Sequence, residues 1–148
     1  MTLQELRNMT RAYARDTNSF MFTNDMVDMF INQAIDRLKH EPVFKGMVKL
    51  RDSIDSPILL PEEYHYMLAL FSASRCLEFD ERFYEATEKR NEFESLFTSL
   101  MAEIEAGNLT ILDGDGNEVE NTACYIDYVV NEYFDVHKPD RDVIKAGE

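Results

Sequence analysis

The 148-residue sequence lacks tryptophan and contains only two cysteines, five glycines and four prolines. Cys76 and Cys124 are too few and too far apart for a zinc or redox motif, so we expect both thiols to be reduced. No run of about 18 apolar residues occurs, so the sequence predicts no transmembrane helix. The first residues are amphipathic and charged, without the apolar segment of a signal peptide, and we expect a cytosolic product.

Positive charge is also scarce, because 15 Lys and Arg stand against 29 Asp and Glu, a formal net charge of −14. Such a balance disfavours nucleic-acid binding through phosphates. Residues 1–60 hold eight basic and eight acidic side chains, whereas residues 61–107 and 108–148 each sum to −7. We interpret the acidity of the second half either as a solvated face or as a surface that repels DNA while lying near it.

Hydrophobic residues make up 45% of the sequence, which is enough for a core, and many recur at helical spacing. Thr2 and Glu5 have the capping-box form and predict one helix start, and Thr23 with Asp25 predicts a second. The second helix should end before Pro42. Its predicted core residues are Met26, Met29, Phe30, Ala34, Ile35 and Leu38.

The next segment, 43–63, shows weak alternation and a "DSP" turn signal, and it predicts an irregular connector or a short hairpin. Pro61 should open a third helix that runs to Phe79. Asp80 should cap a fourth helix, and Gly107 should end it. The predicted core stripe of this fourth helix is Ala86, Arg90, Phe93, Leu96, Phe97, Leu100, Met101 and Ile104.

The last part of the chain changes character. "NLTILDGDGNEV" predicts strand, turn and strand, a short β-hairpin, and the aromatic tail beyond it fits helix and strand almost equally. The fold class predicted is all-α: a small four-helix bundle-like core in residues 1–107, with the hairpin and an extended C-terminal arm in 108–148. The partner-binding candidates of the arm are Tyr125, Ile126, Val129, Val130, Tyr133 and Phe134.

The stretch "LPEEYHYMLALFSASRCLEFDERFYEA" contains side-chain types found in catalytic and metal sites. Glu62 and His65 form one Glu-x-x-His pair, but a ferritin-like site needs two such pairs and two further glutamates. "DGDGNE" departs from an EF-hand loop, which needs glycine at the position of Glu118 and glutamate at that of Cys124. We therefore predict no catalytic, cofactor or metal residues, and an assembly protein rather than an enzyme.

Residues 23–107 resemble the head–tail connector (adaptor) proteins of tailed bacteriophages. The resemblance is carried by a Leu-Pro start, a Tyr-His pair, the small-residue stretch "ASR", the acidic step "EFDER" and a long helix that contains "EF". It implies a virion protein, made in the host bacterial cytoplasm, that forms a homo-oligomeric ring of about twelve copies at the head–tail junction. Such a ring lies between the portal protein and the tail or a second connector ring, and extends the DNA channel.

Two groups of charged residues are candidates for surfaces of this ring. DNA should pass an acidic wall without specific binding, because like charges repel. The candidates for an acidic channel or inter-subunit face are Glu78, Asp80, Glu81, Glu85 and Glu88. The candidates for a basic inter-subunit face, or else a solvated helix face, are Arg7, Arg11 and Arg15, at four-residue steps.

Two other functions remain open at this point. Glu78, Glu81, Glu85 and Glu88 have the spacing of helix carboxylates that could hold Mg²⁺ in an all-α nucleotide pyrophosphohydrolase, although Tyr66 stands where that motif needs a further glutamate. The second alternative is a cytosolic helical regulator that binds one protein partner. Phosphate release from nucleoside triphosphates would separate the enzyme from the adaptor.

Overall fold

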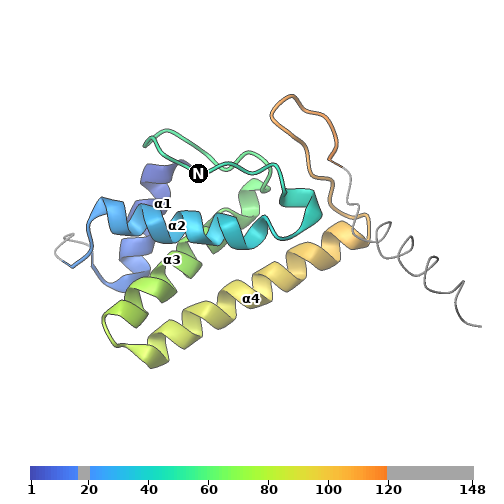
Figure 1. Cartoon of the computed structure of the whole chain (residues 1–148). Coiled ribbons are helices and arrows are strands. Elements are labelled where there is room, and N and C mark those ends of the chain that lie inside the picture. The colour runs from blue at the N-terminus through green and yellow to red at the C-terminus, as the bar shows by residue number, and fades with distance from the viewer. Residues whose placement is uncertain (17–20, 120–148) are drawn as a thin grey trace, which may run out of the picture.

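The computed structural model describes residues 1–16 and 21–119, and the predicted arm lies outside these ranges. The described chain contains four α-helices and two short 3-10 turns, so the all-α prediction is confirmed (Figure 1). Helix α3 packs against each of the other three helices. The elements are α1 (Leu3–Ala14), α2 (Asn24–Leu38), η1 (Pro42–Phe44), η2 (Glu62–Tyr64), α3 (Tyr66–Phe79) and α4 (Phe83–Glu105).

Local capping explains where the first two helices begin, as the sequence predicted. The Thr2 hydroxyl accepts from the Glu5 amide at 3.3 Å, and the Glu5 carboxylate accepts from the Thr2 amide at 2.8 Å. The Thr23 hydroxyl accepts from the Met26 amide at 3.2 Å. Each cap supplies an acceptor to an amide that the helix itself leaves unpaired, and a cap of this kind contributes about 1 kcal/mol.

The buried face of α2 differs from the predicted stripe. Met29 is 49% exposed and Met26 is only partly buried, so the prediction was wrong for these two residues. Val27 and Ile31 are fully buried in their place. Both stripes satisfy helical spacing, and the choice follows from packing against α1 and α3, which sequence periodicity does not specify. The residues of α2 that are buried are Val27, Phe30, Ile31, Ala34, Ile35 and Leu38.

Helix α3 is buried nearly all round, as expected for the central helix of a small bundle. Its start is later than predicted, because Pro61 precedes the 3-10 turn η2 and α3 begins at Tyr66. The small residues of "SAS" are buried, and the Ser74 hydroxyl donates to the Phe71 carbonyl at 2.7 Å. The helix satisfies this hydroxyl internally, so a polar residue can occupy the core at little cost.

The corner between α3 and α4 corrects a second prediction. Asp80 does not cap α4; it is the residue that ends α3, while Arg82 precedes α4 without a side-chain cap. Glu81, between them, has φ 60°, a conformation that ends a helix and reverses the chain. At the other end of α4, Gly107 has φ 77° and terminates the helix as predicted. The core stripe of α4 centres on the buried residues Ala86, Phe93 and Leu100.

Residues 108–119 form a turn rather than the predicted β-hairpin, because no strand occurs in the described chain. A single antiparallel bridge joins Leu112 and Glu118, and the Val119 amide donates to the Ile111 carbonyl at 2.8 Å. Ile111 is 2% exposed and belongs to the hydrophobic core. This turn therefore packs with the helical core, although the sequence had grouped it with the arm.

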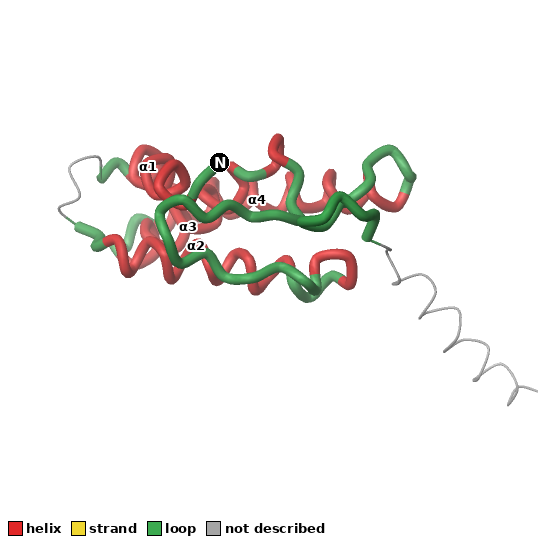
Figure 2. The backbone as a smooth tube through the Cα atoms, turned by 90° about the horizontal axis from the view of Figure 1, so that it is seen from above, coloured by secondary structure: helices red, strands yellow, loops and turns green. Residues whose placement is uncertain are grey.

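The connector between η1 and α3 is irregular, as predicted, and runs along the helices as loop (Figure 2). It is held by specific hydrogen bonds rather than by strand pairing. Asn32 of α2 binds both backbone groups of Leu50, at 3.0 and 2.9 Å. The Leu3 amide donates to the Asp55 carbonyl at 2.7 Å, and the Gln4 amide to the Ser53 carbonyl at 3.1 Å. The connector thus supplies acceptors to the first turn of α1.

Candidate assembly surfaces

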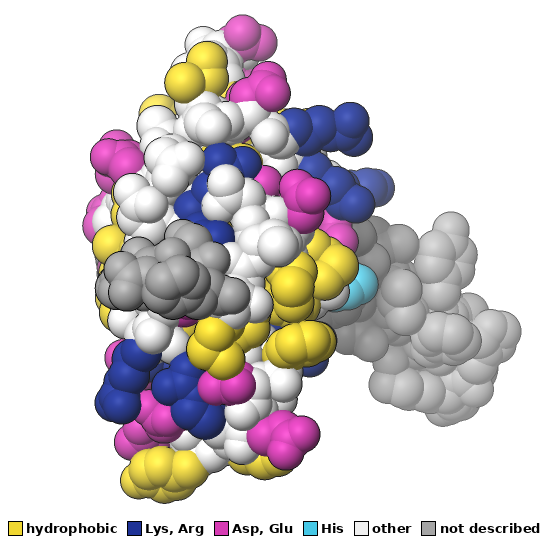
Figure 3. Space-filling model, turned by 90° about the vertical axis from the view of Figure 1, so that its left-hand side faces the viewer, with side chains coloured by type: hydrophobic (Ala, Val, Ile, Leu, Met, Phe, Trp, Pro, Cys, Tyr) yellow, Lys and Arg dark blue, Asp and Glu magenta, His cyan; other side chains and the backbone are white. Residues whose placement is uncertain are grey.

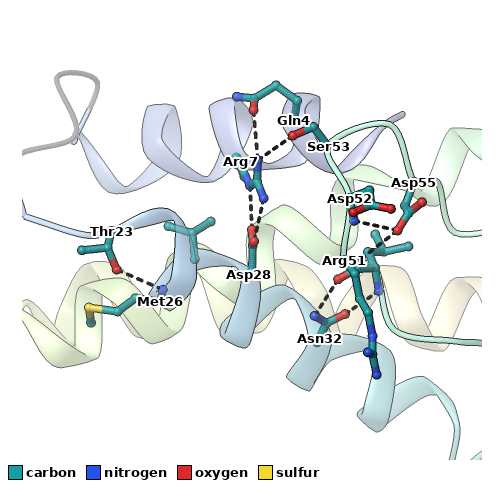
Figure 4. A network of polar contacts seen from close by, with 12 residues as sticks. Gln4, Arg7, Thr23, Met26, Asp28, Asn32, Arg51, Asp52, Ser53 and Asp55 are labelled. Atoms are coloured by element: carbon teal, nitrogen blue, oxygen red, sulfur yellow. Dashed lines mark hydrogen bonds and ion pairs between the residues drawn. The ribbon is translucent and has the colours of Figure 1, made fainter.

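The three arginines of α1 do not form one exposed basic face. Arg7 is 8% exposed, and its guanidinium pairs with Asp28 of α2 through two contacts of 2.7 Å (Figure 4). Its remaining nitrogen donates to Gln4 and to Ser53 of the connector, both at 3.1 Å. The hydrogen bond to Asp28 and the charges of Asp28 and Asp25 raise the pKa of Arg7 against the opposing effect of burial. Arg7 therefore serves the fold, because it ties α1 to α2 and to the connector.

Arg11 and Arg15 have different surroundings. Arg11 is 6% exposed and donates to the Phe22 carbonyl at 2.8 Å, so its charge is also used within the chain. The Arg15 side chain is 75% exposed and lies 3.3 Å from Glu85 at the start of α4. Of the predicted basic face, Arg15 alone offers an exposed guanidinium. Four-residue spacing placed all three arginines on one side of α1, but that side faces α2 and the chain between α1 and α2.

The predicted acidic face lies at the corner of α3 and α4, where arginines neutralise most of it. Glu78 pairs with Arg75 at 3.2 Å and with Arg90 at 3.6 Å. Arg82 lies 2.9 Å from Asp80 and 3.7 Å from Glu85.

Two members of this acidic face remain unpaired. Glu81 and Glu88 are exposed and have no ion-pair partner among residues 1–16 and 21–119. Uncompensated negative charge is therefore confined to two of the five predicted positions.

The histidine and the cysteine of the stretch that begins "LPEEYH" are both buried in the core. His65 is 4% exposed; its Nε2 lies 2.7 Å from the Leu60 carbonyl, and its Nδ1 lies 2.8 Å from the Met1 amine. Burial lowers the pKa of His65, and the hydrogen bond to Leu60 opposes this effect. Burial raises the pKa of the Cys76 thiol to about 12, which leaves it protonated at neutral pH. Within the described part of the chain, no three His, Cys, Asp or Glu side chains gather as a metal site would require.

A cluster of arginines and aromatic rings between α2, α3 and α4 was not foreseen. Arg37 forms a two-point ion pair with Glu94, at 2.7 and 3.0 Å, and lies over the ring of Phe97 at 5.2 Å. Arg75 and Arg90 both lie over the ring of Phe71, at 5.6 and 5.1 Å. These contacts join charged and apolar side chains across three helices. A sequence signal existed for Arg90 alone, which falls within the predicted core stripe of the fourth helix.

Exposed aromatic side chains mark the corner of α3 and α4. Phe79, the last residue of α3, is 67% exposed, and Phe83 and Tyr84, the first residues of α4, are 62% and 78% exposed. Figure 3, which views this end of the molecule, shows hydrophobic side chains at the surface beside acidic and basic ones. Exposed aromatic residues that gather in one place are typical of contact surfaces. We call these three residues the aromatic corner.

An apolar groove lies at the opposite end of the folded molecule, beyond the end of α4. It has a volume of about 250 Å³ and lies between the end of η1, the connector and the turn that follows α4. Val48 and Ile58, on its wall, are 65% and 61% exposed. Figure 1 places this region and the aromatic corner at opposite ends of α4. We call it the connector groove, and its main apolar lining is Val43, Met47, Val48, Ile58, Leu59 and Val119.

The residues Tyr125, Ile126, Val129, Val130, Tyr133 and Phe134 all lie outside the described ranges, as does Cys124. In the described ranges, no helix has both the length and the apolar character that a membrane span requires.

Comparison with known proteins assigns no family to this arrangement. No family model matches the chain, no curated protein matches it, and no solved structure matches its fold. The described residues thus define a small all-α fold with two separate exposed apolar regions.

Proposed function

We propose that the protein is a structural head–tail adaptor of a tailed bacteriophage. In this role a homo-oligomeric ring of about twelve copies joins the portal protein to the tail or to a second connector ring, and DNA passes through it. The proposal begins from the likeness of residues 23–107 to connector proteins. The proposed adaptor has no enzymatic role, and it binds other proteins.

The observation that carries the proposal is the position of the two apolar surfaces. The aromatic corner stands at the start of α4, and the connector groove lies beyond its end. The 23 residues of α4 span about 34 Å at 1.5 Å per residue. Different surfaces at opposite ends of a subunit favour head-to-tail contacts, and such contacts close into rings when the rotation between subunits permits.

The charge of the described core is compatible with a DNA channel. Glu81 and Glu88 are exposed near the corner without ion-pair partners among the described residues. Carboxylates at a channel wall would keep phosphates in solution and let DNA slide. In this proposal Glu81 and Glu88 face either the channel or the neighbouring subunit, while Glu78, Asp80 and Glu85 hold the corner together through arginines.

Quantitative mass spectrometry of purified virus particles from the source culture tests the proposal directly. The measured quantity is the number of copies of this chain per particle, relative to the major capsid protein. The proposal expects about twelve copies, as in a single connector ring. Absence of the chain from intact particles would remove the adaptor function, and a phosphate-release assay with nucleoside triphosphates would then test the hydrolase alternative.

The arm is tested separately, by truncation. Truncation after Gly107 would remove Ile111 from the core, so the better variant ends after Val119. We expect this variant to keep its helical circular dichroism and to lose binding to the portal complex. Loss of the helical signal would show that residues 120–148 support folding, and retention of portal binding would remove the arm from the proposed interface.

A further inference from the structure

We propose that the aromatic corner of one copy docks into the connector groove of the next copy. This inference deepens the proposed ring and rests on it, because it names the two surfaces that would join neighbouring subunits. The side chains that enter the groove are those of Phe83 and Tyr84, at the first turn of α4.

The groove is an apolar site with no occupant among the described residues. Its floor contains buried side chains, including Val43, Met47 and Leu59, while Val48 and Ile58 stand exposed on its walls. Water in such a groove contacts mainly apolar atoms, so an aromatic side chain that replaces it gains the free energy of apolar burial on both partners.

The corner supplies the matching group. Phe79, Phe83 and Tyr84 are each more than 60% exposed, and they project from the place where two helices meet. Large aromatic side chains at a protruding position are the residues that most often anchor protein contacts. The turn is held by Arg82, which donates to the Ala14 carbonyl at 2.6 Å and pairs with Asp80 at 2.9 Å. The corner is therefore preorganised for docking.

Charge identifies the occupant as a second copy of this chain. Glu81 and Glu88, beside the aromatic corner, have no ion-pair partner in the described residues. Lys45 and Lys49, which flank groove residues Gly46 and Val48, are exposed and likewise have none there.

The opposite edge of the groove is acidic. It carries Asp113, whose carboxylate accepts from the amides of Asp115 and Asn117 at 2.9 Å each, and the exposed Asp115 and Glu118 lie on the same turn. The two unpaired carboxylates of the corner are thus attracted to the lysine edge of the groove and repelled by its acidic edge, which favours one orientation of the contact.

Mixing two full-length variants tests the contact. Tyr84→Glu damages the corner and leaves the groove intact, whereas Ile58→Glu damages the groove and leaves the corner intact. Both positions are exposed, so each variant should fold, and thermal circular dichroism verifies this. Light scattering after size exclusion should show wild-type oligomers and, for each variant alone, association weakened at least about tenfold.

The mixture gives the distinguishing result. Each pair has one intact corner and one intact groove, so an equimolar mixture should form one-to-one dimers and nothing larger. A monomeric mixture overturns the contact, and so does a wild-type chain that stays monomeric up to about 1 mM. A monomeric Tyr84→Glu with normal assembly of Ile58→Glu would indicate a corner-to-corner contact, and would also overturn the proposal.

Matched controls identify other occupants. Ile54→Glu introduces the same charge into the same connector at a position that is 82% exposed and not part of the groove, and it should assemble like wild type. Equal weakening by this variant would overturn the assignment of the groove. A second full-length variant combines Tyr133→Ala with Phe134→Ala. If this variant fails to assemble while Tyr84→Glu assembles normally, the C-terminal segment occupies the groove and the aromatic corner does not.

Charge exchange tests the orientation. A chain with Glu81→Lys, Glu88→Lys, Lys45→Glu and Lys49→Glu should assemble with itself and associate poorly with wild type. If this folded variant fails to assemble with itself, the assigned contact is wrong. The two proposals can fail separately. If mass spectrometry finds the chain in the virion but the mixed variants form no dimers, only the contact is wrong. If the mixed variants form dimers but the chain is absent from the virion, only the adaptor function is wrong.

Discussion

Arg7 on α1 and Asp28 on α2 form a two-point ion pair in which the Nε–Oδ1 and Nη2–Oδ2 distances are both 2.7 Å. The exposed fractions of the two side chains are 9% and 19%, so water screens the pair poorly. The same guanidinium donates to Ser53, and one residue thus connects two helices and the connector.

Replacement of Arg7 by methionine should lower the free energy of unfolding by about 3 kcal/mol, because Asp28 would keep its charge in a poorly hydrated place without a partner. Urea denaturation of the full chain measures the change. The control is Arg15→Met, on the same helix but 75% exposed, which should cost less than about 0.5 kcal/mol. Equal losses for the two variants would contradict a structural role specific to Arg7.

The Arg37–Glu94 pair should give a stability contribution that depends on pH. The hydrogen bonds from Arg37 lower the pKa of Glu94, so the unfolded chain takes up this proton at a higher pH than the folded chain. The contribution is complete above the ordinary pKa of glutamate, and it disappears as the pH falls through the lowered folded value.

Glu94→Gln should therefore destabilise the protein at pH 7, by less than about 1 kcal/mol because both side chains are more than a third exposed. The difference from wild type should shrink by about pH 3. Glu88→Gln, on the same helix and without an ion-pair partner in the described residues, is the control. A Glu94→Gln deficit that stays constant with pH would argue against a charged pair as its cause.

His65 should make the fold sensitive to mild acid. Burial lowers its pKa, so below about pH 6.5 the unfolded chain binds more protons than the folded chain and stability falls with pH. Groups that face its ring include the Leu60 carbonyl and the Met1 amine, and Glu62 lies 3.5 Å from that amine. His65→Gln should flatten the dependence of Tm on pH between about pH 8 and about pH 5. His40→Gln, which removes an exposed imidazole, is the matched control.

The thiol of Cys76 should be unreactive in the native protein. It is fully buried, and burial raises its pKa to about 12, so thiolate is scarce at neutral pH. In a Cys124→Ser chain, maleimide should label Cys76 only when denaturant unfolds the core. Rapid labelling of the folded variant would reveal local opening of α3 and would contradict a rigid central helix.

Features governed by local geometry could be predicted from the sequence. The capping box of Thr2 and Glu5, the cap at Thr23 and the terminating Gly107 depend on residues within one turn, and all three were confirmed. Asp80 failed as a predicted cap because Glu81 adopts a left-handed conformation first and moves the start of α4 past it. Residues such as Asp occur near both the start and the end of helices, so the residue type alone does not show whether Asp80 ends α3 or begins α4.

The candidate surfaces depended on contacts between distant segments, which spacing does not encode. Arg7 and Arg11 share a side of α1, but Asp28 and the Phe22 carbonyl determine that this side is buried. The sequence analysis identified the acidic residues of the corner, whereas only the fold shows that Arg75, Arg82 and Arg90 neutralise most of them. The aromatic corner was missed because exposure of an aromatic residue cannot be read from helical periodicity when the helix boundary itself is uncertain.

The three residues 80–82, which connect α3 to α4, also restrict where the chain can gain or lose residues. One residue inserted there would rotate α4 by about 100° about its axis and would turn Phe93 and Leu100 away from the core. An insertion at the exposed tip of the turn at 114–116 would leave α1 to α4 in register, because it follows α4. Natural or engineered variants of this protein should thus vary in length at the tip, while the step from α3 to α4 keeps its residue count.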